Sequence, residues 1–188
     1  MKRGMCGDNL FWTLDDDGTL TIDGTGVMYN FTDKLQTPWH EFKLSAIKKV
    51  VINDGATSIG DEAFSRCYGL TSVEIPASVY SIGNKAFFAC FDLAAVNVPS
   101  GVMKINNQTF QRCTSLTSFK IPSHVRAIGY WAFEGCSGLT EIKIPAAVTS
   151  IGWQSFDGCI NLEKIFYKAG RGFEEDLSVG NPAQLIPY

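Results

Sequence analysis

The sequence lacks the features that mark several broad functional classes. It has no cluster of basic residues, and its 188 residues carry a net charge of −3, so nothing indicates nucleic-acid binding. No stretch approaches the roughly 18 consecutive apolar residues of a membrane-spanning helix. The opening residues MKRGMCGDNL have basic side chains with no apolar segment behind them, unlike a signal peptide. We expect no nucleic-acid partner and no membrane insertion.

Residues typical of catalytic and metal sites are equally scarce. The two histidines, His40 and His124, cannot be paired with a nucleophile or carboxylate, and His124 lies in a turn where we expect it to be exposed. No pair of cysteines has the spacing of a zinc site. Asp15-Asp16-Asp17-Gly18 lacks the alternating acidic positions of a calcium loop and indicates a turn. We therefore expect no enzymatic activity, no cofactor and no metal ion.

What the sequence does contain is a strict repeat. A Phe-x-x-Cys motif recurs five times, each step 23 residues long, without insertion or deletion. Its phenylalanines are Phe64, Phe87, Phe110, Phe133 and Phe156, and its cysteines are Cys67, Cys90, Cys113, Cys136 and Cys159. A fixed period of this length is typical of a solenoid, in which one supersecondary unit stacks on copies of itself.

Each unit predicts two short strands and an outer turn. Val73 and Ile75 alternate as in a strand with one buried side, and Pro76 ends it because proline cannot donate to a ladder. Ile82-Gly83 indicates a second extended segment closed by a glycine turn, although Asn106 replaces glycine once. The Ala-Phe-x-x-Cys segment spaces apolar residues at i and i+3, which predicts a helical or 3₁₀ turn on the outer side.

The six cysteines are interpreted as core residues. Five occupy the same position of successive units and form a column, where a buried thiol packs as a small apolar group. The distance between stacked neighbours would allow a disulfide, but pairing within a column of five cysteines would leave one cysteine unpaired. We predict six free thiols, with Cys6 packed beneath the N-terminal segment.

The two ends depart from the repeat. In residues 1–46, Asn9–Leu14 and Thr19–Ile22 alternate around a turn and predict a β-hairpin, which would cap the exposed first coil. The solenoid is assigned to residues 47–168. Residues 169–188 no longer follow the pattern and are interpreted as a C-terminal cap, with Leu185–Tyr188 as a closing strand.

The unit Leu-x-x-Ile-x-Ile-Pro-x-x-Val-x-x-Ile-Gly-x-x-Ala-Phe-x-x-Cys resembles the BspA-type leucine-rich repeat. The segments CGDNLFWTLDDDGTLTIDGTGVM and PWHEF resemble the N-terminal cap of such proteins, and EEDLSVGN resembles their closing segment. The resemblance implies a right-handed leucine-rich-repeat coil with a parallel inner sheet. It also implies a bacterial cell-surface or extracellular protein that functions in adhesion and protein binding and has no catalytic residues. This sequence departs from that expectation in showing no signal peptide.

Two surfaces are candidates for binding. The first is the concave sheet, whose outward strand positions would contact a protein partner such as a host or matrix protein. The alternative is an ordinary solvated sheet that binds nothing. We expect the chain to be a monomer. The contact residues predicted on this face are Glu74, Asn97, Lys120, Glu141 and Lys143.

The second surface is aromatic. The positions before Ala-Phe change from polar residues in the early repeats to Tyr130, Trp131 and Trp153 in the later ones. Exposed, clustered aromatic rings mark binding sites and here predict a carbohydrate-binding patch, unless these rings pack under the C-terminal cap. The same alternatives apply to Tyr68 and Phe91. A spacer that binds nothing is the third hypothesis.

Overall fold

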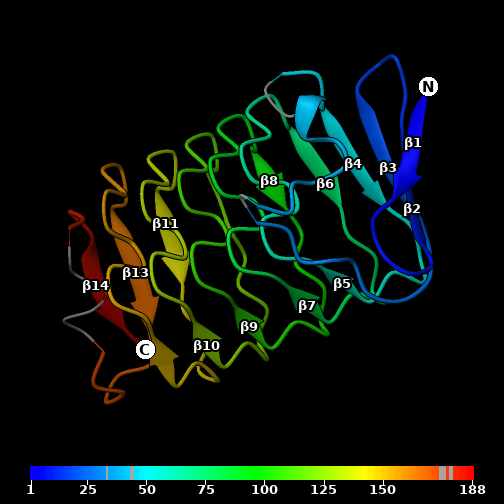
Figure 1. The fold of residues 1–188 in the computed structure, drawn as a ribbon. Helices are drawn as coiled ribbons and strands as arrows, with labels where there is room; N and C mark the ends of the chain where they lie inside the picture. Colours follow the sequence, from blue (N-terminus) through cyan, green and yellow to red (C-terminus); the bar gives the residue numbers. More distant parts are fainter. Residues whose placement is uncertain (33, 43–44, 174–176, 178–179) are drawn as a thin grey trace.

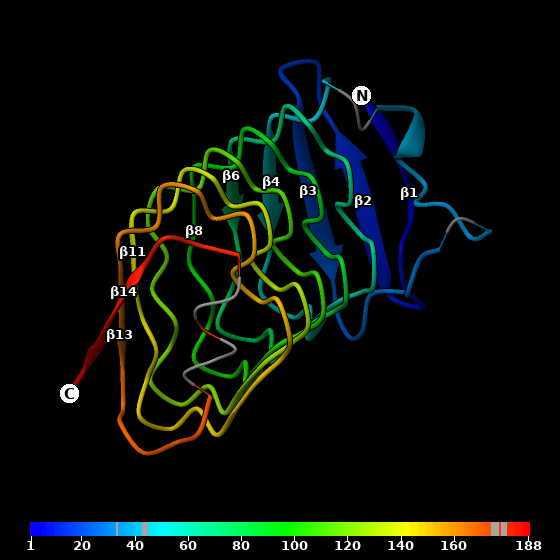
Figure 2. The ribbon, with the colours of Figure 1, turned by 90° about the vertical axis from the view of Figure 1, so that its left-hand side faces the viewer.

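Successive coils stack along one axis into a β-solenoid in the computed structural model (Figure 1), which describes residues 1–32, 34–42, 45–173, 177 and 180–188. Seen from the C-terminal end, the coils lie one behind another as loops around a common interior (Figure 2). The predicted repeat solenoid is confirmed. No single coil can bury its own apolar residues, so neighbouring coils share one continuous core.

The strands on the first side of the coils form the inner sheet. They are β4 (Lys49–Ile52), β6 (Ser72–Glu74), β8 (Ala95–Val96), β11 (Glu141–Lys143) and β13 (Lys164–Tyr167). Neighbouring strands pair in parallel, with equivalent residues of successive repeats opposite each other, as in Ser72 with Ala95 and Glu141 with Lys164. Their inward residues, such as Val50 and Ile142, are buried while the outward ones face solvent.

A second side carries shorter parallel strands of two residues each. These are β5 (Ser58–Ile59), β7 (Ser81–Ile82), β9 (Lys104–Ile105), β10 (Ala127–Ile128) and β12 (Ser150–Ile151). Each buries its isoleucine. The second extended segment predicted from the Ile-Gly pairs is therefore confirmed.

The third side differs from the predicted helical or 3₁₀ turn. Its segments are successive hydrogen-bonded turns, and the single 3₁₀ helix in the described residues is η1 (His40–Phe42), outside the repeats. Glu62 and Arg66 have φ values of 54° and 62°, which a helix cannot contain. The reason is that alternate N–H groups, including that of Phe64, donate to the next coil instead of along the chain.

The N-terminal hairpin is confirmed and continues the inner sheet. Strands β2 (Leu10–Leu14) and β3 (Thr19–Gly24) are antiparallel, and β3 pairs in parallel with β4. The sheet begins with β1 (Lys2–Met5), which the sequence did not predict, in the order β1-β2-β3-β4-β6-β8. Cys6 is buried as expected.

The C-terminal strand is also present. Strand β14 (Gln184–Pro187) pairs in parallel with β13, Lys164 opposite Gln184, and ends the order β11-β13-β14. It takes the position of the next inner strand. The stretch EEDLSVGN, which resembles the closing segment of related proteins, falls largely outside the described residues.

The core is organised around an aromatic column. Trp39 and the five repeat phenylalanines stack in order with ring centroids 5.4 to 5.6 Å apart. Beside them the cysteines are buried and reduced, and the thiol of each later coil donates to a phenylalanine carbonyl of the preceding one, as from Cys113 to Phe87 at 3.2 Å. The cysteines therefore join neighbouring coils, which excludes a role as exposed nucleophiles.

This burial predicts a loss of stability in alkali. Burial raises the pKa of Cys6 and of Cys159 from the ordinary 9.0 to about 12, and holds that of Cys113 and Cys136 well above 9.0. Above pH 9 the unfolded chain releases thiol protons that the folded chain keeps, so the free energy of unfolding falls as pH rises. We expect a decrease on the order of 1 kcal/mol per thiol between pH 8 and pH 10, measured by urea unfolding under reducing conditions.

The control is a variant with Cys113 and Cys136 replaced by alanine, which should lose less stability over the same interval. Titration with a thiol reagent should show slow labelling of the native protein and six reactive thiols in urea. Rapid native labelling, or a pH dependence equal in the variant, would contradict a buried thiol column.

Candidate functional site

The inner sheet is interrupted between β8 and β11. The coil between them forms no strand on this side, and in the described part of the chain no backbone hydrogen bond joins residues 117–121 to a neighbouring coil. On this side, Figure 1 shows the coil as a plain tube between the arrows of β8 and β11. The strand predicted here is absent. Within the residues that the structure describes, the backbone N–H and C=O groups of residues 117–121 are therefore left without a bond to either neighbouring coil.

Phe119 distinguishes this coil from the others. Its equivalents are Val73, Val96, Ile142 and Ile165. The Phe119 ring is buried in the core, with its centroid 4.9 Å from that of Phe110 and 4.8 Å from that of Phe133. A phenyl ring reaches further from the backbone than a β-branched side chain. The missing strand thus coincides with the one inner-strand position at which a phenyl ring replaces a β-branched side chain. The change from a β-branched residue to Phe119 is visible in the sequence, and it was the signal that could have predicted the interruption of the sheet.

An open groove of about 1240 Å³ lies over the interruption. The apolar residues that line it include Val98, Phe119, Ile121 and Ile142. The polar ones include Asn97, Ser118, Lys120, Glu141 and Lys143. Two aromatic side chains, Phe166 and Tyr188, line its C-terminal end. The groove thus combines apolar surface, mixed charge and open backbone groups.

Four of the five contact residues predicted from the sequence line this groove: Asn97, Lys120, Glu141 and Lys143. The fifth, Glu74, does not line it. Glu74 lies on β6 and its carboxylate forms an ion pair with Lys49 at 2.5 Å. The structure therefore gathers the predicted residues of three successive coils and separates the first of the set from them.

The two groove lysines differ in their surroundings. Lys143 places its Nζ 4.5 Å from the centroid of the Tyr188 ring, and the Tyr188 hydroxyl donates to the Ile144 carbonyl at 2.7 Å. Lys120 has no ion pair within the residues that the structure describes. Its exposed ammonium group is therefore the cation most available to an incoming carboxylate.

His124 was predicted to be exposed, and this is wrong. The side chain is partly buried at the edge of the groove, and its Nε2 atom is buried without a hydrogen-bond partner in the described structure. The turn after Pro122 folds this ring against the groove instead of into solvent. Sequence reasoning missed His124 as a groove residue because the equivalent positions hold Ser78, Gly101 and Ala147.

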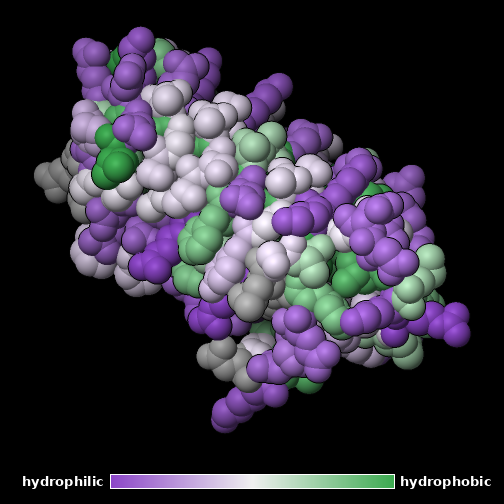
Figure 3. All heavy atoms as spheres, turned by 90° about the horizontal axis from the view of Figure 1, so that it is seen from above, coloured by the Kyte–Doolittle hydropathy of each residue, from purple (hydrophilic) through white to green (hydrophobic). Residues whose placement is uncertain are grey.

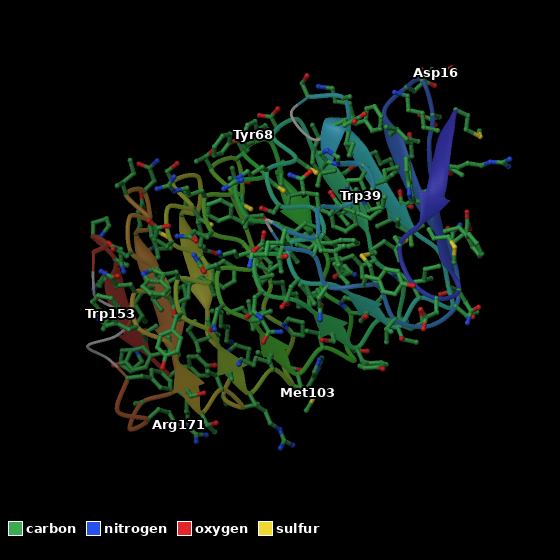
Figure 4. All side chains as sticks on the ribbon, in the orientation of Figure 1. Asp16, Trp39, Tyr68, Met103, Trp153 and Arg171 are labelled. Carbon is green, nitrogen blue, oxygen red and sulfur yellow. The ribbon has the colours of Figure 1, made fainter. Side chains whose placement is uncertain are left out.

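Trp153 lies at the end of the solenoid remote from Asp16 (Figure 4), and the other two predicted aromatic residues, Tyr130 and Trp131, lie close to it. Trp131 contacts both neighbours, with ring centroids 6.2 Å from Tyr130 and 6.0 Å from Trp153. Tyr130 is 53% and Trp153 52% exposed, so these two are not packed under a cap. Trp131 is partly buried. We call these three residues the aromatic platform.

Tyr68 and Phe91 are stacked with ring centroids 4.8 Å apart. Tyr68 lies on the upper edge (Figure 4). Seen from above, the molecule is a mixture of hydrophilic and weakly hydrophobic side chains with small, scattered apolar areas (Figure 3). This pair is therefore a local ring stack and not part of a broad apolar patch.

Neither a metal-binding cluster nor a membrane-spanning helix is present among the described residues. Across the part of the chain that the structure describes, no group of three or more His, Cys, Asp or Glu side chains is placed to hold a metal ion. The same residues contain no helix that is long and apolar enough to cross a bilayer.

A family model described as the BspA type leucine rich repeat region matches residues 38–168 in six copies. The chain belongs to the BspA-type leucine-rich repeat family. The resemblance seen in the sequence is confirmed. Proteins of the BspA type are generally non-catalytic repeat proteins of bacterial surfaces.

Solved structures agree with this BspA-type assignment. A leucine-rich repeat protein from Eubacterium ventriosum has 28% identity and a TM-score of 0.72, covering 90% of this chain and 45% of that one. The T. pallidum leucine rich repeat protein has 27% identity and a TM-score of 0.62, with 82% and 67% covered. A leucine rich cell surface protein from Faecalibacterium prausnitzii has 26% identity and a TM-score of 0.57, with 86% and 53% covered.

This BspA-type chain thus spans about half the length of the Eubacterium and Faecalibacterium proteins. No curated protein matches the sequence.

Proposed function

We propose that this chain is a non-enzymatic protein-binding module of a bacterial cell-surface or secreted protein, and that it binds through the groove over the interrupted inner sheet. The observation that carries the proposal is the meeting of three features at one place: open backbone groups, apolar lining and an unpaired lysine among the described residues. Leucine-rich repeat proteins generally mediate protein interactions, and a similar structure is a cell surface protein.

The groove suits an extended segment of a partner protein. Main-chain N–H and C=O groups that form no bond to a neighbouring coil can form single hydrogen bonds with a polypeptide lying in the groove, while side-chain contacts supply specificity. Ile75 and Phe166 line the groove, are only partly buried and offer apolar contact to such a segment. Lys120 offers a charge for a carboxylate of the partner. A host or matrix protein with an acidic, exposed segment is the partner that this chemistry favours.

The test uses a photo-crosslinking amino acid at Ser118, in the groove, or at Lys104, which is exposed on β9. Both proteins are applied to a panel of immobilised matrix proteins, and we expect crosslinks from position 118 only. Exchange of Lys120 and Lys143 for glutamate should then weaken binding to the crosslinked protein at least tenfold, while Lys104→Glu leaves it unchanged. Equal crosslinking from both positions would overturn the proposal, and binding to no protein would favour a spacer.

A further inference from the structure

A polar ladder runs along the turn side of the early coils. It consists of Asn30, Asp61, Asn84 and Asn107, whose side-chain Oδ1 atoms each accept the backbone N–H of the next residue in the series. The bonds are Asp61 to Asn30 at 2.9 Å, Asn84 to Asp61 at 2.6 Å, Asn107 to Asn84 at 3.2 Å, and Tyr130 to Asn107 at 3.0 Å. Each bond helps to join two coils.

The polar ladder stops at Tyr130. A tyrosine has no acceptor atom close to its backbone, so nothing takes the place of the Asn oxygen for the next coil. In the described residues the backbone N–H of Trp153 accordingly has no hydrogen-bond partner. At this point the chain lacks the side-chain to backbone hydrogen bond that joins the earlier coils, and the rings of Tyr130 and Trp153 are exposed. A local rule that is broken without a structural gain is typical of a functional site.

Trp131 departs from the repeat in residue type. Its φ of 54° lies in the left-handed region, as at the same position of every other coil, where the residues are Glu62, Lys85, Gln108 and Gln154. Trp131 is the one bulky aromatic residue at this position, in a conformation that such residues rarely adopt. The Trp131 Nε1 donates to the Gln154 Oε1 at 2.8 Å, which fixes the ring between its two neighbours. The Trp131 ring is therefore held at the centre of the aromatic platform by one hydrogen bond and two ring contacts.

Polar side chains border the aromatic platform. On its N-terminal side, the Gln108 Nε2 donates to the Gln111 Oε1 at 2.6 Å, and the Gln111 Nε2 donates to the Glu134 Oε2 at 2.5 Å. Gln154 lies on its C-terminal side and is only partly buried. Amide groups therefore stand on both sides of the exposed indole and phenol rings, and a carboxylate stands on one side.

We propose that the aromatic platform is a second binding site and that its ligand is a neutral oligosaccharide. The C–H face of a pyranose ring stacks on Trp153 or Tyr130, and its hydroxyl groups bond to Gln154 and Glu134. A protein partner fits less well, because a standard interface covers about 800 Å² on each side and needs a broad apolar centre. Here three rings are bounded by polar groups, which matches the size and chemistry of sugar units.

The experiment applies the whole chain to a printed array of neutral and acidic oligosaccharides, and the glycans that bind are then titrated against tryptophan fluorescence. We expect binding of neutral glycans, and at least a tenfold weaker affinity in Trp153→Ala. The decisive variant exchanges Tyr130 and Trp153 for asparagine. It extends the polar ladder, so the protein should unfold at a higher urea concentration while glycan binding is lost.

Phe91→Ala serves as the control, because it removes an exposed ring elsewhere, and it should bind glycans as the unchanged chain does. Absence of any glycan binding, or binding that survives the double asparagine exchange, would overturn the proposal. So would loss of binding to a groove-bound protein in that variant, which would mark the aromatic platform as a protein contact. The groove variants at Lys120 and Lys143 should leave glycan binding unchanged.

Discussion

Replacing Phe110 with alanine is expected to lower the free energy of unfolding by about 3 to 5 kcal/mol. The Phe110 ring is fully buried at the centre of the aromatic column, with the rings of Phe87 and Phe133 each at 5.6 Å and that of Phe119 at 4.9 Å. Removing it leaves a cavity bounded by three rings whose backbones are fixed by the stacking of their own coils. Such a cavity cannot collapse fully, which places the cost near the upper part of the usual range.

The measurement is urea unfolding followed by tryptophan fluorescence. In a solenoid each repeat contacts only its neighbours, so a weakened central coil should also broaden the transition or divide it into two. Phe91→Ala is the matched control, since this ring is 37% exposed and stacks only at the surface; it should cost less than about 1 kcal/mol. Similar losses in both variants would show that the column does not carry the core.

The sequence predicts the repeating part of this fold well because each spacing that recurs along the chain results directly from how the coils pack. The phenylalanine and cysteine columns are buried throughout, and Val79, like its equivalents in later coils, is buried where its position predicts. Stacking identical coils puts every repeated apolar residue over its own copy. Periodicity alone therefore locates the core and the strands of both rows, apart from the strand that is absent at residues 117–121.

Features that depend on backbone pairing were harder to predict. Strand β1 has no apolar alternation, and it exists because its backbone bonds to β2. The turn side shares its i, i+3 apolar spacing with a helical turn, and only the hydrogen bonds between coils distinguish the two. Trp39 also escaped notice as the first member of the aromatic column, because it lies 25 residues before Phe64, outside the strict period.

The candidate sites were predicted in part. Outward strand positions follow from alternation, which is why Lys120 and Lys143 could be named, whereas the groove depends on a lost ladder that alternation cannot reveal. The aromatic platform was visible as a change of residue type at fixed positions. Its relation to the polar ladder became apparent only when the Oδ1 contacts of Asn84 and Asn107 were known.

The close approach of coils at the Ile-Gly pairs leads to the second large effect. A Cβ at Gly129 would lie 2.6 Å from the backbone nitrogen of Asn107, and one at Gly152 would lie 2.4 Å from that of Tyr130. The Gly129 N–H also donates to the Ile105 carbonyl at 2.8 Å. Gly129→Ala must therefore separate two coils and break this bond. We expect it to lower the free energy of unfolding by about 3 kcal/mol, measured by urea unfolding.

Asn106 shows how the chain tolerates a side chain at the equivalent position. Its Nδ2 donates to the Ile82 carbonyl at 2.6 Å, the role that the glycine N–H has in the other coils. Gly129→Asn should accordingly cost about half as much as Gly129→Ala, although asparagine is the larger residue, because its amide replaces the lost donor. If the asparagine variant is instead the less stable of the two, steric separation of the coils governs this position and the amide at Asn106 does not compensate for the missing glycine.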